Sequence, residues 1–134
     1  MELRITAESQ VNPTEDQDKV ERAIRNIFPS AKLEQISFEG NVIRLRGHGE
    51  GLDFLKTLRS LIKQERIRSA ARSVILSGTR ESQIHFYLNK QAAFAGRVSF
   101  CEPVGESPLG PISIKIEVAN PDAVVRFLTS RPGE

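Results

Sequence analysis

The segment that most constrains the fold is the stretch from residue 2 to residue 29, where a strand pattern changes into a helix pattern. Residues 2–11 alternate between apolar and polar side chains, which predicts a strand with one buried and one solvated face. Thr14 and Gln17 have the spacing of a capping box, and Pro29 marks the end of the helix that they would start. The apolar residues of this helix recur at helical spacing: Val20, Ala23, Ile24, Ile27 and Phe28. The stretch therefore predicts a strand followed by an amphipathic helix.

The rest of the chain repeats these two patterns and predicts a mixed fold. Gly40 and Asn41 form a tight turn between two strands, one around residues 36–38 and one over residues 42–46. Further strands are expected over residues 83–89, 97–101 and 111–118, and further helices over residues 52–62, 67–75 and from residue 121 onward. We therefore expect a single α+β domain over residues 1–134, with a mainly antiparallel sheet and helices packed on one of its faces.

The composition is that of an ordinary globular chain. Hydrophobic residues make up 39% and charged residues 27% of the 134 positions, and no apolar run approaches the roughly 18 residues that a membrane helix needs. The N-terminal residues have no secretory leader pattern, so we expect a cytoplasmic protein. The single cysteine, Cys101, excludes an internal disulfide, and its apolar surroundings in the sequence predict a small core side chain rather than a reactive thiol.

Positive charge is concentrated in the middle of the chain. The net charge is +2, but residues 44–80 hold nine Lys or Arg against three Asp or Glu. Arg44, Arg46 and His48 alternate along one face of a predicted strand. Four more cations lie within one arc of the next helix: Lys56, Arg59, Lys63 and Arg66. Nucleic-acid phosphate is the natural partner of such a stripe, and the alternatives are an ordinary solvated face or a protein contact.

A glycine-rich segment supplies a second candidate site. Gly47, Gly49 and Gly51 are expected to form a loop between a strand and a helix, where backbone N–H groups can hold an anion. Their spacing differs from that of the known phosphate-binding loops, and Glu50 would repel a phosphate. A flexible connection without a ligand is therefore the alternative.

The sequence has no catalytic constellation. The HExxH, CxxC and GxSxG motifs are absent, and no cofactor or metal site is predicted, so we do not expect an enzyme. His85 and Tyr87 share the polar side of a predicted strand and are the one pair expected to stack on nucleic-acid bases. The sequence motifs of RRM and KH domains are absent.

Three segments together are similar to a known family. They are residues 11–29, which begin Val11-Asn12-Pro13-Thr14-Glu15-Asp16, then Leu88-Asn89-Lys90-Gln91-Ala92-Ala93, and finally Pro108-Leu109-Gly110-Pro111-Ile112. With the arginine-rich helices between them, the chain resembles the archaea-restricted uncharacterised protein family 0201 over nearly its whole length. The resemblance implies a fold like that of the fifth large-subunit ribosomal protein, a homodimer, and a suggested link to RNA or the exosome. It assigns no catalytic residues.

The leading hypothesis is a dimeric protein of unknown activity with a weak, sequence-nonspecific RNA-binding role. The residues expected to contact RNA are all cationic: Arg44, Arg46, Lys56, Arg59, Lys63, Arg66 and Lys90. Two interpretations stay open for Asn89, Lys90 and Gln91. The two amides satisfy backbone groups at a strand end while Lys90 is exposed, or the three form a polar patch for a ligand. The first rival hypothesis is a dimeric protein-interaction module that binds no nucleic acid, and the second is an anion-binding or enzymatic role at the glycine-rich segment.

Overall fold

The structure of the chain is a computed structural model that describes residues 2–40, 42–104 and 109–130, without the side chains of residues 37–39. Its strands are β1 (Leu3–Val11), β2 (Lys32–Glu39), β3 (Val42–Glu50), β4 (Thr79–Arg80), β5 (Gln83–Leu88) and β6 (Ile112–Val118). Its helices are α1 (Gln17–Ile27), α2 (Lys56–Gln64), α3 (Arg68–Ser77), α4 (Lys90–Phe94) and α5 (Pro121–Thr129), and a 3-10 turn, η1, covers Leu52–Leu55. The predicted α+β class is confirmed.

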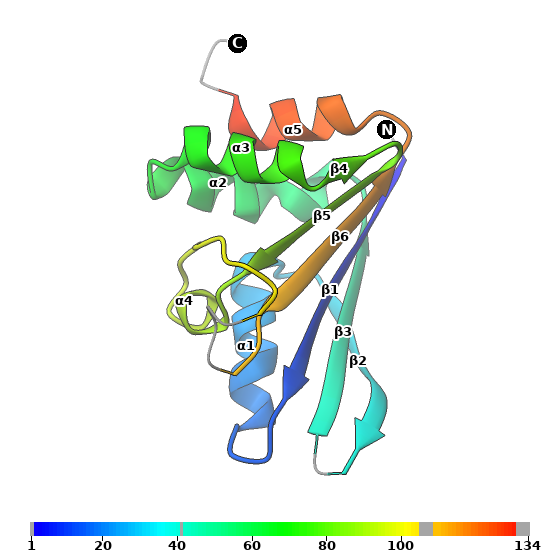
Figure 1. Cartoon of the computed structure of the whole chain (residues 1–134), viewed down its shortest axis with the longest axis vertical. Helices are drawn as coiled ribbons and strands as arrows, with labels where there is room; N and C mark the ends of the chain where they lie inside the picture. Colours follow the sequence, from blue (N-terminus) through cyan, green and yellow to red (C-terminus); the bar gives the residue numbers. More distant parts are fainter. Residues whose placement is uncertain (1, 41, 105–108, 131–134) are drawn as a thin grey trace.

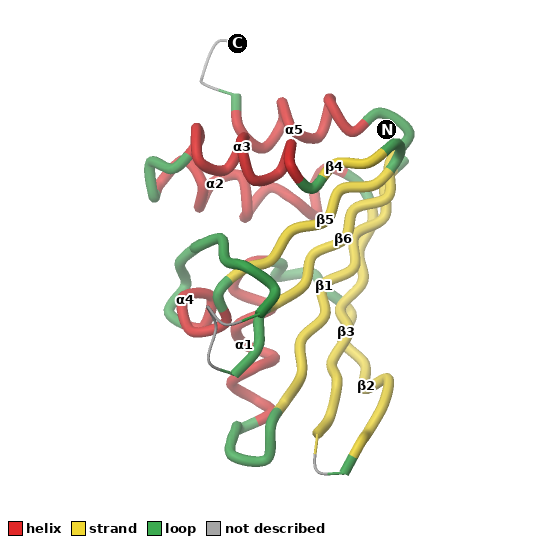
Figure 2. Tube along the Cα trace, in the orientation of Figure 1, coloured by secondary structure: helices red, strands yellow, loops and turns green. Residues whose placement is uncertain are grey.

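Within the described residues, six strands form one antiparallel sheet in the order β2-β3-β1-β6-β5-β4. The first and the last strand of the chain, β1 and β6, therefore lie side by side at its centre (Figure 2). The helices lie on one side of the sheet (Figure 1). The prediction of a mainly antiparallel sheet with helices on one face is confirmed.

The alternation along β1 decides which side of the sheet the helices cover. Leu3, Ile5 and Ala7 are buried under the helices, whereas Arg4 between them is exposed on the opposite side. The apolar residues predicted for the first helix complete this core, because all of them are buried: Val20, Ala23, Ile24, Ile27 and Phe28. We call the uncovered side of the sheet the open face. Its side chains include Arg4, Thr6, Glu8, Arg44, Arg46, His48, His85, Tyr87, Ser113 and Lys115.

The helices form two groups (Figure 1). In one group α5 packs against both α2 and α3 near one end of the sheet, and in the other α1 packs against α4. We call α2, α3 and α5 the three-helix layer. The two groups give the covered side of the molecule two separate surfaces.

The start of α1 differs from the predicted capping box. Asp16 is the N-cap, because its side chain accepts a hydrogen bond from the Asp18 N–H over 2.9 Å. Residues 12–15 form a turn first: the Glu15 N–H donates to the Asn12 carbonyl, and the Glu15 carboxylate accepts from the Asn12 N–H. The prediction that Thr14 caps the helix is therefore wrong, whereas the helix does end before Pro29.

The predicted strand over residues 97–101 is also wrong. The segment makes one isolated bridge, between Leu88 and Phe100, and is otherwise irregular. The pairing extends no further because β5 ends at Leu88, where α4, a helix that was not predicted, begins. Cys101 accordingly lies half-buried in an irregular segment rather than in a core strand.

Candidate nucleic-acid interface

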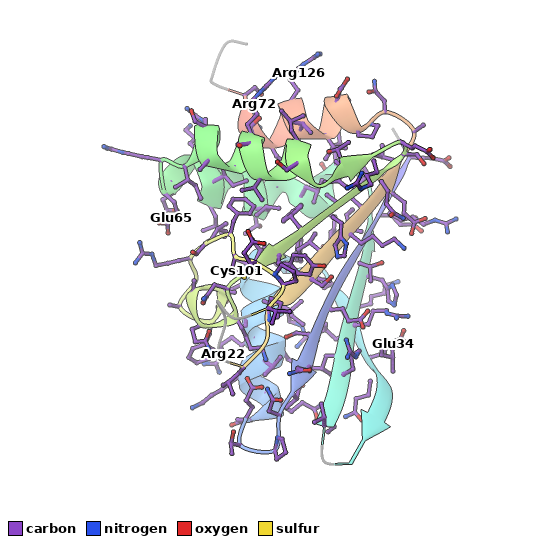
Figure 3. All side chains as sticks on the ribbon, viewed as in Figure 1. Arg22, Glu34, Glu65, Arg72, Cys101 and Arg126 are labelled. Atoms are coloured by element: carbon purple, nitrogen blue, oxygen red, sulfur yellow. The ribbon has the colours of Figure 1, made fainter. Side chains whose placement is uncertain are left out.

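The two strand arginines of the predicted RNA surface are paired within the sheet. Both contact Glu8 of β1: the distance is 3.2 Å from Arg44 Nη1 to Oε1 and 3.3 Å from Arg46 Nε to Oε2. His48, on the same open face, lies 3.0 Å from the carboxylate of Glu34, which Figure 3 labels on β2. Arg44 and Arg46 therefore already face a carboxylate, which weakens their attraction for an added phosphate.

The three-helix layer carries most of its cations without such partners. Its Lys and Arg residues, together with one in the turn after α2, are Lys56, Arg59, Lys63, Arg66, Arg68, Arg72 and Arg126, which we call the helix-layer surface. Lys56 pairs with Asp53 over 3.1 Å. No described carboxylate forms an ion pair with the other six. Figure 3 shows Arg72 of α3 and Arg126 of α5 on the same side of the molecule.

Packing joins α2 to α5 within this surface. The Arg59 guanidinium lies 5.0 Å from the centre of the Phe127 ring, a cation–π contact across the two helices. The turn that follows α2 is tied to Arg97, because the Glu65 carboxylate accepts two hydrogen bonds of 3.1 Å each from the Arg97 guanidinium. This pairing lowers the pKa of Glu65 and raises that of Arg97.

The strand cations and the helix cations do not share one surface. Leu58 and Ile62 are the buried residues of α2, so Arg59 and Lys63 are turned away from the sheet. Arg44 projects from the open face, with the sheet between it and α2. The set predicted from the sequence is thus divided between opposite sides of the molecule.

Lys90 is not available to a nucleic acid, because it is 4% exposed. Its Nζ donates to the Glu15 carboxylate over 3.0 Å and to the carbonyl oxygens of Gln10 and Leu109 over 2.8 Å each. Burial lowers the pKa of Lys90, although the hydrogen bond and charge of Glu15 oppose the shift. The prediction that Lys90 is exposed is therefore wrong.

The three segments that carry the family resemblance meet at this lysine. Asn12 Nδ2 donates to Glu15 Oε1 over 2.7 Å and to the Leu109 carbonyl over 2.9 Å. Asn89 caps α4, since its side chain accepts the Ala92 N–H over 2.9 Å. The third segment is described from residue 109, so its first proline lies outside the described residues. The segments therefore build a buried polar junction, which agrees with the structural interpretation of Asn89.

Gly47 and Gly49 lie inside β3, so the prediction of a glycine loop is wrong for these residues. β3 runs between β2 and β1, and its N–H groups are directed at these two strands instead of converging on an anion. Gly51 follows the strand and donates its N–H to the Leu3 carbonyl. Close packing explains the glycine at position 49 of the strand, because a Cβ on Gly49 would overlap the Phe54 ring.

Gly49→Ala is expected to reduce the free energy of unfolding by about 1–3 kcal/mol. Phe54 has no room to move, because its ring is 5% exposed and stacks on Phe28 with centroids 5.1 Å apart. Urea unfolding measures the loss. The control is Gly49→Ala combined with Phe54→Leu, which should lose less than the sum of the two single changes. Strict additivity would contradict the overlap.

The predicted base-stacking pair does lie on the open face. The rings of His85 and Tyr87 are 4.8 Å apart, and His85 Nε2 lies 2.8 Å from the Ser113 hydroxyl. Burial lowers the pKa of His85, and the charge of Lys115 lowers it further. At neutral pH the imidazole is therefore uncharged and adds nothing to phosphate attraction.

In the described ranges, no group of three His, Cys, Asp or Glu side chains is placed to hold a metal ion. No helix in the described part of the chain is long and apolar enough to cross a membrane.

Phe94 has no counterpart among the predicted site residues. It is 39% exposed at the end of α4, and two cations of α1, Lys19 and Arg22, lie near its ring. The signal that could have placed it is Asn89, a good N-cap at the start of a short run of helix-forming residues.

The comparisons with known proteins decide the family. A family model described as RNA binding matches residues 4–118. A UPF0201 protein from Sulfolobus acidocaldarius is 39% identical over 128 residues, which cover 96% of this chain and 88% of that protein. The chain belongs to the UPF0201 family. A UPF0201 protein from Methanopyrus kandleri is likewise 41% identical over 130 residues, covering 93% of this chain and 81% of the relative.

The solved structures agree with this family. The crystal structure of the UPF0201 protein from Methanococcus jannaschii matches with a TM-score of 0.85 at 32% identity, over 94% of this chain and 98% of that chain. A second UPF0201 crystal structure matches with a TM-score of 0.82 at 34% identity, over 96% and 94% of the two chains. The resemblance to the uncharacterised family is confirmed. The family model that matches this chain carries an RNA-binding description, and the relatives are named only as UPF0201 proteins.

Proposed function

We propose that this UPF0201 protein binds RNA through the helix-layer surface, by phosphate contacts that do not depend on base sequence. The observation that carries the proposal is the group of six cations on α2, α3, α5 and the turn after α2 that have no ion pair with a described carboxylate. Lys and Arg that neutralise phosphates release counterions, which is the main source of nonspecific affinity for nucleic acid. The RNA-binding description of the family model supports the same function.

The charge pairing favours the helix-layer surface over the open face. On the open face a phosphate would compete with Glu8 for Arg44 and Arg46, and with Glu117 for Lys115. On the three-helix layer Lys63 and Arg72 are exposed and offer charge without that competition. For the same number of cations, the electrostatic attraction of a phosphate is therefore stronger at the helix-layer surface than at the open face.

The backbone of Arg66 is a second, independent support. Its φ is +59°, a left-handed conformation in which glycine is the usual residue. The Arg66 N–H donates to the Lys63 carbonyl over 3.1 Å and the Ile67 N–H to the Ile62 carbonyl over 3.2 Å, which is the Schellman pattern of a helix end. The chain thus carries a cation where glycine would be about 1 kcal/mol more stable, which supports a functional role for that side chain.

Arg66→Gly is therefore expected to raise the free energy of unfolding by about 1 kcal/mol while it weakens RNA binding. Loss of one phosphate contact should also reduce the slope of log affinity against log salt by about 1. The matched control is Glu81→Gly, because Glu81 has a φ of +51° in the β4–β5 turn. The control should gain stability without losing RNA affinity. Wild-type RNA affinity in Arg66→Gly would count against the helix-layer surface.

The proposed function is tested by fluorescence anisotropy with a labelled RNA hairpin at about 50 and 200 mM salt. With about six phosphate contacts, affinity should fall roughly a thousandfold between the two conditions. A change of hairpin sequence should leave the affinity the same. Failure of the folded protein to bind at the lower salt concentration would refute the proposal.

The homodimer and the cytoplasmic location stay predictions. In the rival function, a protein-interaction module, the helix-layer cations would pair with carboxylates of a partner rather than with phosphate. Light scattering at low and high salt measures the dimer. A dimer that dissociates with salt and leaves no RNA affinity at any salt would favour the rival.

A further inference from the structure

A cleft of about 320 Å³ lies between α1 and α4, outside the helix-layer surface. Its lining includes Asp16, Lys19, Val20, Lys90, Phe94 and Leu109. Larger hollows of about 610 and 560 Å³ lie where Arg4, Glu50 and Glu117 meet, and they hold charges of both signs and no exposed Phe or Tyr ring. The smaller cleft differs from them because it presents a phenylalanine ring, that of Phe94, to solvent.

Phe94 is exposed and yet fixed in place. Among the Phe and Tyr side chains that the structure describes, it is the only exposed one, at 39%. α4 is held at its first turn by the Asn89 cap. Near its end, Asn26 Nδ2 donates to the carbonyls of Ala93 over 2.9 Å and of Phe94 over 3.1 Å. These hydrogen bonds fix the backbone that carries the ring. The ring is therefore already in place for a ligand, which reduces the entropy lost on binding.

Two cations of α1 lie over this ring in cation–π contacts. Lys19 Nζ lies 5.9 Å and Arg22 Cζ 6.0 Å from its centre, and Figure 3 labels Arg22 on the α4 side of α1. Neither forms an ion pair with a carboxylate in the described ranges. An aromatic face beside free cations is the combination by which proteins stack a base and hold its phosphate.

We propose that the Phe94 cleft binds one nucleotide, with its base stacked on Phe94 and its phosphate held by Lys19 and Arg22. The volume is within the range of clefts that bind small molecules. Asp16 lines the cleft as well, and its carboxylate can accept a hydrogen bond from a base amino group while it repels the phosphate. The nucleotide is thereby oriented with its phosphate toward Lys19 and Arg22.

The nucleotide is either free or an unpaired residue of an RNA strand, and both present the same chemistry. The intact protein is titrated with adenosine monophosphate and, separately, with single-stranded tetra-adenylate, by calorimetry. Tighter binding of the tetranucleotide identifies an RNA strand as the ligand, and equal affinities identify a free nucleotide. Both results support the proposal, whereas no binding of either probe at millimolar concentration overturns it.

Variants of the ring separate stacking from simple apolar contact. Phe94→Leu keeps an apolar side chain without a π face and should weaken binding about tenfold, whereas Phe94→Trp should retain it. The matched control is Leu76→Ala, because Leu76 of α3 is a similarly exposed apolar residue at 43%. Equal affinity of Phe94→Leu and the wild type would overturn the proposal. So would full displacement of tetra-adenylate by an acidic peptide that lacks aromatic residues, which would identify a protein-docking surface.

This inference does not depend on the helix-layer surface. Lys63→Glu combined with Arg72→Glu should weaken binding of a fully paired RNA duplex at least tenfold and leave tetra-adenylate binding intact. Phe94→Leu should weaken tetra-adenylate binding about tenfold and leave binding of the duplex intact. The two RNA probes therefore test the helix-layer surface and the Phe94 cleft independently of each other.

Discussion

Lys90→Met is expected to lower the free energy of unfolding by about 3–5 kcal/mol, as much as the whole stability of a marginal domain. The Glu15 and Lys90 side chains are 8% and 5% exposed. Removal of the ammonium group leaves the carboxylate buried without its cation. It also removes the donor to the carbonyl oxygens of Gln10 and Leu109. Urea unfolding measures the loss.

The control for Lys90→Met is the same substitution at an exposed ion pair. Lys56 and Asp53 are 3.1 Å apart, and their side chains are 68% and 88% exposed. Lys56→Met should therefore change stability by less than about 0.5 kcal/mol. If Lys90→Met does not fold, Glu15→Gln added to it should restore part of the stability by removing the unpaired charge. A loss no larger than that of Lys56→Met would contradict the buried junction.

The second large effect concerns RNA. Reversal of three helix-layer charges, by Lys63→Glu, Arg66→Glu and Arg72→Glu, is expected to weaken hairpin binding at least a hundredfold at about 50 mM salt. The substitutions remove three phosphate contacts and place three repulsive charges among the cations that stay. Anisotropy measures the affinity, and circular dichroism checks that the variant is folded.

The matched comparison reverses three cations of the open face, Arg44, Arg46 and Lys115, to glutamate. Both triple variants lower the net charge by the same amount, so long-range attraction of RNA falls equally in the two. A difference between them reports the contact surface itself. The open-face variant should bind at least tenfold more tightly than the helix-layer variant. Equal losses would contradict a localised surface.

Local pattern predicted the parts of the fold that depend on neighbours in the chain. β1, β5 and β6 alternate along their length, and α1 and α3 place apolar residues on one side, so each element is encoded within its own segment. The sequence patterns did not predict α4, because its five residues are too few to show a helical periodicity. Its N-cap was the only local signal of it.

The candidate site depended on contacts between distant segments, which single-sequence patterns do not reveal. Lys90 was expected in solvent, but Glu15, 75 residues earlier, pairs with it in the core. Gly49 was expected in a loop, but the ring of Phe54 requires a glycine within the strand. Arg66 was predicted on the same helix as three other cations, but it lies in the turn after α2, whereas Lys56, Arg59 and Lys63 do lie on that helix. The position of these three cations relative to Arg44 depends on which side of the sheet α2 packs.

An NMR titration of the intact protein with the RNA hairpin, followed through the side-chain resonances of its Arg and Lys residues, would locate the RNA-binding surface directly. We predict shifts at Lys63, Arg66, Arg72 and Arg126, with Arg44 and Arg46 unchanged and still paired with Glu8. Shifts concentrated at Arg44 and Arg46, with the resonances of α2 and α3 unmoved, would contradict this prediction.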